Sequence, residues 1–465
     1  MLGALALALV FGAGLSWCVV RSPLTLYDGL DPIITAHDSP SVAATFRDAL
    51  GAAAYFRPLR LAQIKWFFDL RPWDPVGTYT AVHATLLCLT LALFVLFLRP
   101  MVANEFRAAT IALMVLVGHQ SFFILVAEQY PINHFLEMVA LAVAVAAAAR
   151  GRPRRWKEFL VPALLVLGVL TLESGVLIAV VAVACWAVGW RGVSGRAVLI
   201  CVLLVAGYFW IRVGVFGVSG PGLDERASGY WLSRLEPRDL IEKFGNNPLP
   251  FYAYNVMSGF LDVTASEPRD GRWIMLSRWL DGDFRLWMAI QLVSSLVLSA
   301  AIASAAVSAL RNWGRGALTE RDRFVLVALA VVGANSILSY AYIKDEVLSV
   351  GAAFYAAAAY AVLASLLADV PRTRPMALLA ALVVLSVSLL WTSRAAGTFF
   401  NLRSFAYKTA ADWGGYEPEQ EMPADWASPA TRRLFLDLRR SNLGRSVPHP
   451  YFTNEESVQP YVEIR

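Results

Sequence analysis

The sequence predicts an all-α polytopic membrane protein with about eleven transmembrane helices. Its 465 residues are 58% hydrophobic and only 16% charged, whereas about a quarter of the residues in a typical soluble domain are charged. The mean hydropathy is +0.55. Basic residues gather in short loops between long apolar runs, where they set membrane orientation. The net charge of +5 therefore does not indicate nucleic-acid binding.

A helix needs about 20 apolar residues to cross a bilayer. The first run lacks a basic n-region and a small-residue cleavage site, so we expect it to be an uncleaved span. Single spans are expected over residues 2–20, 79–98, 107–127, 133–149, 197–216, 286–309, 323–343, 347–368 and 375–391.

The remaining run, residues 158–190, is too long for one span and short for two. Basic loops at 150–157 and 191–196 flank it, so both of its ends belong on the same side of the membrane. We expect a tight hairpin with its tip at residues 171–175. Each arm of about 15 residues is about 22 Å long, so Glu173 at the tip lies within the membrane. An ionisable residue at that depth is a functional candidate.

The basic loops place the N-terminus inside. Residues 1–391 then form the transmembrane domain, with long outer loops at 21–78 and 217–285. The C-terminal tail, 392–465, faces out. The first outer loop is expected to carry two interfacial helices, and the tail one short helix after Ser428 that rests on the outer face. These three helices are expected over residues 41–56, 59–70 and 429–440.

This topology brings ionisable residues from distant segments to the outer boundary of the membrane. Carboxylates mixed with cations suit a reaction in which one group accepts a proton while others hold a phosphate. The candidates are Asp28, Asp31, Arg57, Glu128, Glu173, Arg212, Lys344, Asp345 and Glu346.

Simpler interpretations exist for several of these residues. Asp28 and Asp31 also suit a turn before Pro32. Arg212 could extend its charged end from the end of a span to the membrane surface. Lys344 also suits a solvent-exposed turn. The DxD spacing at residues 281–283 also fits a loop-to-helix junction. The histidines lack zinc-motif spacing, so zinc is disfavoured. No cofactor is indicated, and the DxD spacing leaves a divalent metal open.

Four motifs carry a family resemblance. An acidic segment, "YDGLD", follows the first span; "YFRPL", residues 55–59, precedes a span that contains His83; "LTLESG" contains Glu173; and "YFWIRVGVFG" contains Arg212. This pattern resembles the GT-C glycosyltransferases, in particular the bacterial relatives of the protein O-mannosyltransferases. The resemblance covers the first half of the chain well and the second half in topology. The chain departs from the family in separating the two acids and in placing Leu172 where the family has lysine.

The resemblance implies transfer of a sugar, with inversion, from a polyprenyl-phosphate donor to a glycan, lipid or protein acceptor outside the membrane. Asp28 would be the general base. Asp31 is the second choice, because Pro32 favours an extended conformation at the preceding residue. Glu128 would orient the acceptor. The donor phosphate would bind Arg57, Arg212 and Lys344.

Other classes remain open. An O-antigen-type polymerase or ligase would use the arginines of residues 217–285, a secondary transporter would place its charges at the midplane, and a GT-C-like protein without catalysis would keep the fold alone. The Ala-, Arg- and Val-rich composition indicates a bacterial protein, and hence the cytoplasmic membrane.

Overall fold

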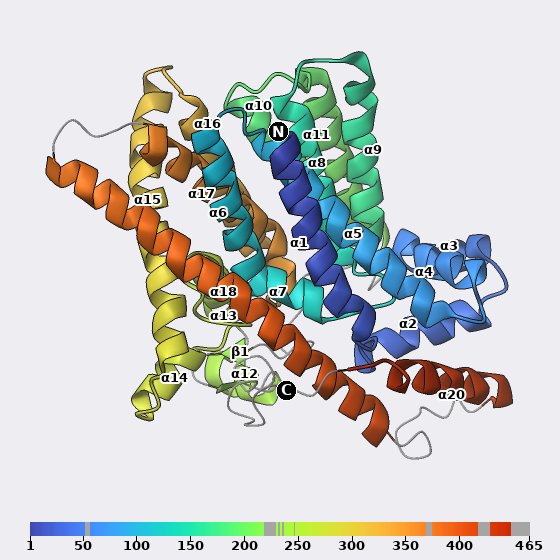
Figure 1. The fold of residues 1–465 in the computed structure, drawn as a ribbon. Helices are drawn as coiled ribbons and strands as arrows, with labels where there is room; N and C mark the ends of the chain where they lie inside the picture. The colour runs from blue at the N-terminus through green and yellow to red at the C-terminus, as the bar shows by residue number, and fades with distance from the viewer. Residues whose placement is uncertain are drawn as a thin grey trace.

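The computed structural model describes residues 1–51, 56–217, 229–230, 233–234, 237–245, 247–368, 374–416 and 428–447. Nearly all regular structure in these residues is helical (Figure 1). The exception is an antiparallel pairing of two short strands, β1 (Gly229–Tyr230) with β2 (Ser233–Arg234).

A bundle of mostly long helices forms the main body (Figure 1). A continuous apolar core joins them. The helices are α1 (Leu2–Arg21), α5 (Pro75–Leu98), α6 (Ala103–Gly118), α7 (Gln120–Ala127), α8 (His134–Arg150), α9 (Arg155–Thr171), α10 (Val176–Ala187), α11 (Gly195–Phe209), α15 (Leu286–Gly314), α16 (Glu320–Leu338), α17 (Ser349–Ala368) and α18 (Arg374–Gly415). Successive helices run in opposite directions, except that the short α7 continues from α6 after a bend.

Six helical segments among the described residues are long and apolar enough to cross a membrane. The pair α6 and α7, bent by 64° at His119, makes a seventh if it counts as one span. Every expected run contains helix, but α8, α9 and α10 have only 17, 17 and 12 residues. The count of eleven spans stays a prediction.

The two ends of the bundle differ in charge. The loops that follow α5, α8, α10 and α15 meet at the end that also holds the N-terminus (Figure 1). Arginines from two of these loops and from the adjoining ends of α8 and α16 line one cavity there. We call this the basic end of the bundle. We call the opposite end, where α1 leads into α2, the platform end.

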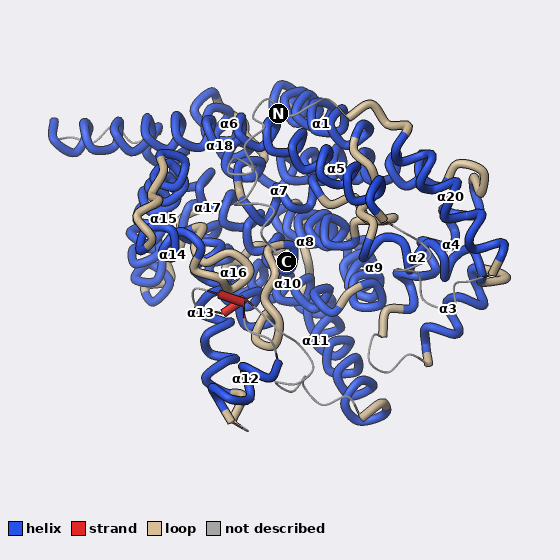
Figure 2. The backbone as a smooth tube through the Cα atoms, turned by 90° about the horizontal axis from the view of Figure 1, so that it is seen from below, coloured by secondary structure: helices blue, strands red, loops and turns tan. Residues whose placement is uncertain are grey.

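The platform consists of helices that lie across the platform end instead of along the bundle (Figures 1 and 2). The platform helices are α2 (Tyr27–Asp38), α3 (Val42–Leu50), α4 (Pro58–Leu70) and α20 (Pro429–Leu443). Helices α2, α4 and α20 share a second apolar core, which includes Leu30, Phe68, Trp413 and Phe435, and α3 packs against α4. The helices expected over 59–70 and 429–440 are confirmed, and that expected over 41–56 is confirmed only over Val42–Leu50, with residues 52–55 outside the described part of the chain. Ser428 caps α20 through a 3.1 Å hydrogen bond from the Thr431 N–H.

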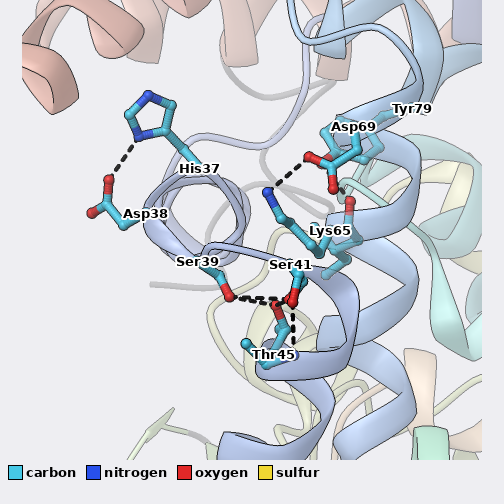
Figure 3. A network of polar contacts seen from close by, with 10 residues as sticks. His37, Asp38, Ser39, Ser41, Thr45, Lys65, Asp69 and Tyr79 are labelled. Carbon is cyan, nitrogen blue, oxygen red and sulfur yellow. Dashed lines mark hydrogen bonds and ion pairs between the residues drawn. The ribbon is translucent and has the colours of Figure 1, made fainter.

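Polar contacts fix the ends of the platform helices (Figure 3). The Ser41 hydroxyl accepts the Ala44 N–H and caps α3, as serine does at many helix N-termini. The Lys65 ammonium lies 2.7 Å from the Asp69 carboxylate one turn along α4. At the end of α2, His37 Nδ1 lies 2.7 Å from Asp38.

The segment that carries Asp28 and Asp31 is a helix, which the sequence analysis did not predict. Both residues lie in α2, and Pro32 is inside it. The expectation that Pro32 makes Asp31 extended is therefore wrong. Packing explains the difference, because Leu30, Ile33 and Ile34 are buried in the platform core and offset the cost of one missing N–H.

The last helix of the bundle is longer than expected. The apolar run ends at residue 391, but α18 continues without a break to Gly415. Its buried residues keep helical spacing through this extension, at Trp391, Arg394, Thr398 and Leu402 and on to Trp413. A boundary between residues 391 and 392 thus falls inside a helix, and the tail proper begins after α18.

The segment that was expected as the second long outer loop also contains helices. They are α12 (Pro237–Phe244), α13 (Leu249–Ala265) and α14 (Ile274–Leu280). Helix α13 packs against α16, where Gly259 approaches Ser336. The Asn255 amide donates a 3.0 Å hydrogen bond to the Tyr340 carbonyl. Part of this segment is therefore integral to the bundle.

Candidate functional site

The site begins with an ion-pair cluster at the platform end. Both Nε and Nη2 of Arg57 approach Oε2 of Glu173, at 2.8 and 2.6 Å. Arg212 Nη1 lies 3.4 Å from Oε1 of the same carboxylate. The three side chains are partly buried, with exposed fractions of 21%, 33% and 15% for Arg57, Glu173 and Arg212. Three motifs far apart in the chain thus meet at one carboxylate.

Two glycines make the hairpin that presents Glu173. The residue lies in a 3-10 turn, Glu173–Gly175, between α9 and α10. A Cβ on Gly175 would lie 2.2 Å from the backbone carbon of Gly168, so only glycine permits this approach. The hairpin is thereby closed at its tip, as the sequence predicted.

Backbone geometry also positions the two arginines. Arg57 immediately precedes α4, which begins with Pro58, a residue suited to the first helical turn. Arg212 lies in a π-helical segment, Trp210–Val215, that ends α11. Such segments are rare and are frequently found at functional sites. Tyr208, one turn earlier, accepts a 3.2 Å hydrogen bond from Arg212 Nη1.

Aromatic rings border the cluster. Phe56 lies next to Arg57, and its ring centroid is 6.4 Å from that of Tyr208 and 5.4 Å from that of Phe216. Phe56 is 7% exposed. The rings exclude water from one side of the cluster and strengthen its electrostatic interactions, because the local dielectric constant is lower there.

A second group of ionisable residues lies beside it, where the loops after α7 and α16 meet. The Tyr130 hydroxyl donates a 2.5 Å hydrogen bond to Glu128, and Lys344 Nζ is 3.4 Å from Glu346. Burial, with the negative charges of Glu346 and Asp28, raises the pKa of Glu128 to about 8. The neighbouring carboxylates in turn raise the pKa of Lys344.

Asp28 connects the two groups. The charge of Asp28 contributes to the pKa shifts of both Glu128 and Arg60. The charges of Arg57 and Glu173 also contribute to the shift of Arg60. Burial lowers the pKa of Arg60. Asp31 lies three residues along α2 from Asp28, so the two carboxylates lie on neighbouring turns of one helix face. Both side chains are exposed, which leaves them accessible to a substrate.

The structure therefore brings most of the expected residues together. Asp28, Glu128, Glu173, Arg57, Arg212 and Lys344 are linked by ion pairs or by mutual electrostatic effects. His83 differs, because it is 1% exposed within α5 and takes part in none of the ion pairs of the described residues. Asp345 faces Asp270, whose N–H and carboxylate exchange hydrogen bonds with it.

Sequence reasoning missed two residues of the site. Arg60 follows Arg57 by three positions, so helical spacing was the available signal. Tyr130 lies two residues after Glu128 in the segment between α7 and α8, and its neutral side chain is not among the carboxylates and cations that the sequence analysis considered. Its hydroxyl is the hydrogen-bond donor to Glu128.

The arrangement can bind an anion next to a base. A guanidinium has five N–H donors and can hold Glu173 and a phosphate at once. Asp28 supplies an exposed carboxylate nearby. Among the described residues, no group of three or more His, Cys, Asp or Glu side chains is arranged to hold a metal ion.

Comparisons with known proteins add no relative to these geometric observations. No protein-family model, curated protein or solved structure matches the chain.

Proposed function

We propose that the chain is a membrane glycosyltransferase of GT-C type that transfers a sugar from a polyprenyl-phosphate donor to a hydroxyl acceptor. The observation that carries the proposal is the meeting of Arg57, Glu173 and Arg212. These residues come from three separate motifs of the family resemblance. A shared site explains why all three motifs occur in one chain.

The chemistry follows from the charges. Asp28 accepts the proton of the acceptor hydroxyl while the oxygen attacks the anomeric carbon. The bond from that carbon to the phosphate oxygen breaks, and polyprenyl phosphate leaves with the bonding electrons. Arg57 and Arg212, with Lys344 close to Glu128, stabilise the negative charge on the leaving phosphate.

The test compares the full chain in nanodiscs with Asp28→Asn and Asp31→Asn, using a panel of polyprenyl-phosphate sugars and acceptors. Release of polyprenyl phosphate is measured. Loss of a general base typically costs between about 10²- and 10⁴-fold in rate, so we expect at least a 100-fold fall for Asp28→Asn. Asp31→Asn is expected to retain most of the activity.

The matched control is Asp48→Asn, an exposed aspartate on α3 of the same platform. It removes the same charge away from the ion pairs and is expected to change the rate less than twofold. Full activity of Asp28→Asn would remove the base assignment. Absence of turnover by the folded wild-type protein with every donor would contradict the glycosyltransferase proposal.

A further inference from the structure

The basic end of the bundle holds a cavity of about 450 Å³ that the proposed reaction does not use. Four guanidinium groups and one carboxylate line it, together with Met101, Gly189 and Trp190. The charged residues are Arg99, Arg150, Arg191, Arg323 and Glu320. Four positive charges against one negative charge leave a surplus of three.

The single carboxylate is already engaged. Glu320 Oε1 lies 2.7 Å from Arg150 Nε, and Trp190 Nε1 donates a 3.2 Å hydrogen bond to the other oxygen. Arg150 Nη1 also donates a 2.7 Å hydrogen bond to the carbonyl of Phe97. Arg150 and Glu320 thus neutralise each other and leave the other arginines to set the potential of the cavity.

The other three arginines form no ion pair with the described residues. Arg191 donates to the Trp186 carbonyl at 2.7 Å. Arg99 Nη2 reaches the Ala147 carbonyl at 3.4 Å, and its pKa is lowered by burial and by the charge of Arg150. Arg323 Nε is buried and has no hydrogen-bond partner in the described chain. A buried, unsatisfied donor in a positive cavity indicates a site for an anion.

An apolar groove begins where this cavity ends. It has a volume of about 430 Å³ and lies between α10, α11, α15 and α16. The two sites adjoin in the chain, because Val188 of the groove precedes Gly189 of the cavity, and Leu326 follows Arg323 by about one helical turn. The groove lies at the surface, since Val183, Val202 and Trp313 are 37%, 46% and 47% exposed.

We propose that the cavity and the groove together bind one anionic glycerophospholipid, with its phosphate on Arg99, Arg191 and Arg323 and an acyl chain in the groove. Basic pockets between membrane helices bind such headgroups. A soluble phosphate would leave the groove unused. A zwitterionic headgroup would add a positive charge to a cavity that already has a surplus. The inference is independent of the proposed reaction.

The test uses native mass spectrometry of the purified full chain with phosphatidylglycerol, cardiolipin or phosphatidylcholine. We expect the anionic lipids to bind at least tenfold more tightly than phosphatidylcholine. Arg323→Gln and Arg99→Gln should each weaken that binding about tenfold. The control, Arg315→Gln, removes an exposed charge of the same end outside the cavity and should change it less than twofold.

A groove variant separates the possible sources of the anion. Val183→Trp fills the groove and should weaken lipid binding without changing the thermal shift caused by inorganic pyrophosphate. Equal binding of phosphatidylcholine would overturn the proposal. So would tight binding of pyrophosphate that excludes lipid, or a preference for polyprenyl phosphate over glycerophospholipid. If Arg323→Gln does not fold, Arg191→Gln with Arg99→Gln carries the test.

Discussion

Glu128 is the residue whose chemistry depends most on its neighbours. It accepts a 2.5 Å hydrogen bond from the Tyr130 hydroxyl. Its pKa also responds to the charges of Asp28, Lys344 and Glu346. Its pKa of about 8 means that it is mostly protonated at neutral pH. A protonated carboxyl can donate a hydrogen bond to an acceptor oxygen, which a carboxylate cannot do.

Replacing Glu128 by glutamine should reduce the pH dependence of stability. The folded protein holds the Glu128 proton up to about pH 8, whereas an unfolded chain releases it near pH 4.5. The contribution is therefore fully present below about pH 4.5 and is lost as the pH rises through 8. We expect the unfolding midpoint of the wild type to fall between pH 6 and pH 9, and that of Glu128→Gln to fall less.

The measurement is thermal unfolding in one detergent across that range, and the informative quantity is the difference between the two proteins. Glutamine keeps an acceptor for Tyr130, so loss of packing should not obscure the result. Parallel curves for wild type and Glu128→Gln would show that Glu128 is already ionised in the folded protein.

At the residue scale, the sequence identified candidate site residues better than it identified the contacts between them. Ionisable residues in apolar surroundings are conspicuous, which identified Glu173 and Arg212. Their pairing was not predictable, because it depends on the π-helical segment that places Arg212. His83 was chosen from the motif pattern alone, and its burial in α5 depends on how the helices pack.

The hairpin of α9 and α10 is the element on which the ion-pair cluster depends. Gly168 and Gly175 face each other at its tip, and a Cβ on Gly175 would meet the Gly168 carbonyl oxygen at 2.5 Å. A Cβ closer than about 3 Å to backbone atoms forces the backbone to move. The tip that carries Glu173 would move with it.

Gly175→Ala should therefore separate the helices, displace Glu173 from Arg57 and lower the unfolding midpoint. Overpacking of this kind typically costs about 1–3 kcal/mol. The control is Gly207→Ala in α11, where a Cβ would meet nothing within 4 Å and alanine favours the helix. Equal unfolding midpoints for the two variants would show that the tip tolerates a side chain.

At the element scale, sequence patterns were reliable for long apolar helices and for the capped helices α3 and α20. They failed where proline or polar residues interrupt a one-sided buried stripe. The extension of α18 keeps a single buried stripe that includes Arg394, which donates to Ser295 at 2.8 Å and to Ser266 at 3.0 Å. A search for apolar runs alone ends the helix before such a polar residue, and therefore assigns the rest of the helix to the C-terminal tail. The same limit hid α2, where a proline and three acidic residues conceal buried leucine and isoleucine side chains.

At the scale of the whole molecule, the two ends serve different chemistries. The platform end gathers carboxylates and arginines beneath helices that lie across the bundle, and α20 is tied into it from the far end of the chain. The Asn442 side chain accepts the Leu24 N–H at 2.8 Å, and Trp413 Nε1 donates to the Leu24 carbonyl at 2.6 Å. Helix α20 and the end of α18 therefore brace the segment that leads into α2 and thereby position Asp28.

Membrane orientation is the prediction that joins both ends. The positive-inside rule places the basic end in the cytoplasm and the platform outside. Asp48 is an exposed residue of α3, and the exposed Asp281 directly follows α14; both helices lie at the platform end (Figure 1). In intact cells, a membrane-impermeant maleimide should label Asp48→Cys and Asp281→Cys. It should label Arg315→Cys, which directly follows α15 at the basic end, only after the membrane is permeabilised. Cys185 and Cys201 are buried, and Cys18 and Cys88 partly so, so the wild type supplies the background. Labelling of Arg315→Cys in intact cells would show that the orientation is the reverse of the predicted one. Asp28 would then face the cytoplasm, where a donor and an acceptor on the outer side could not reach it.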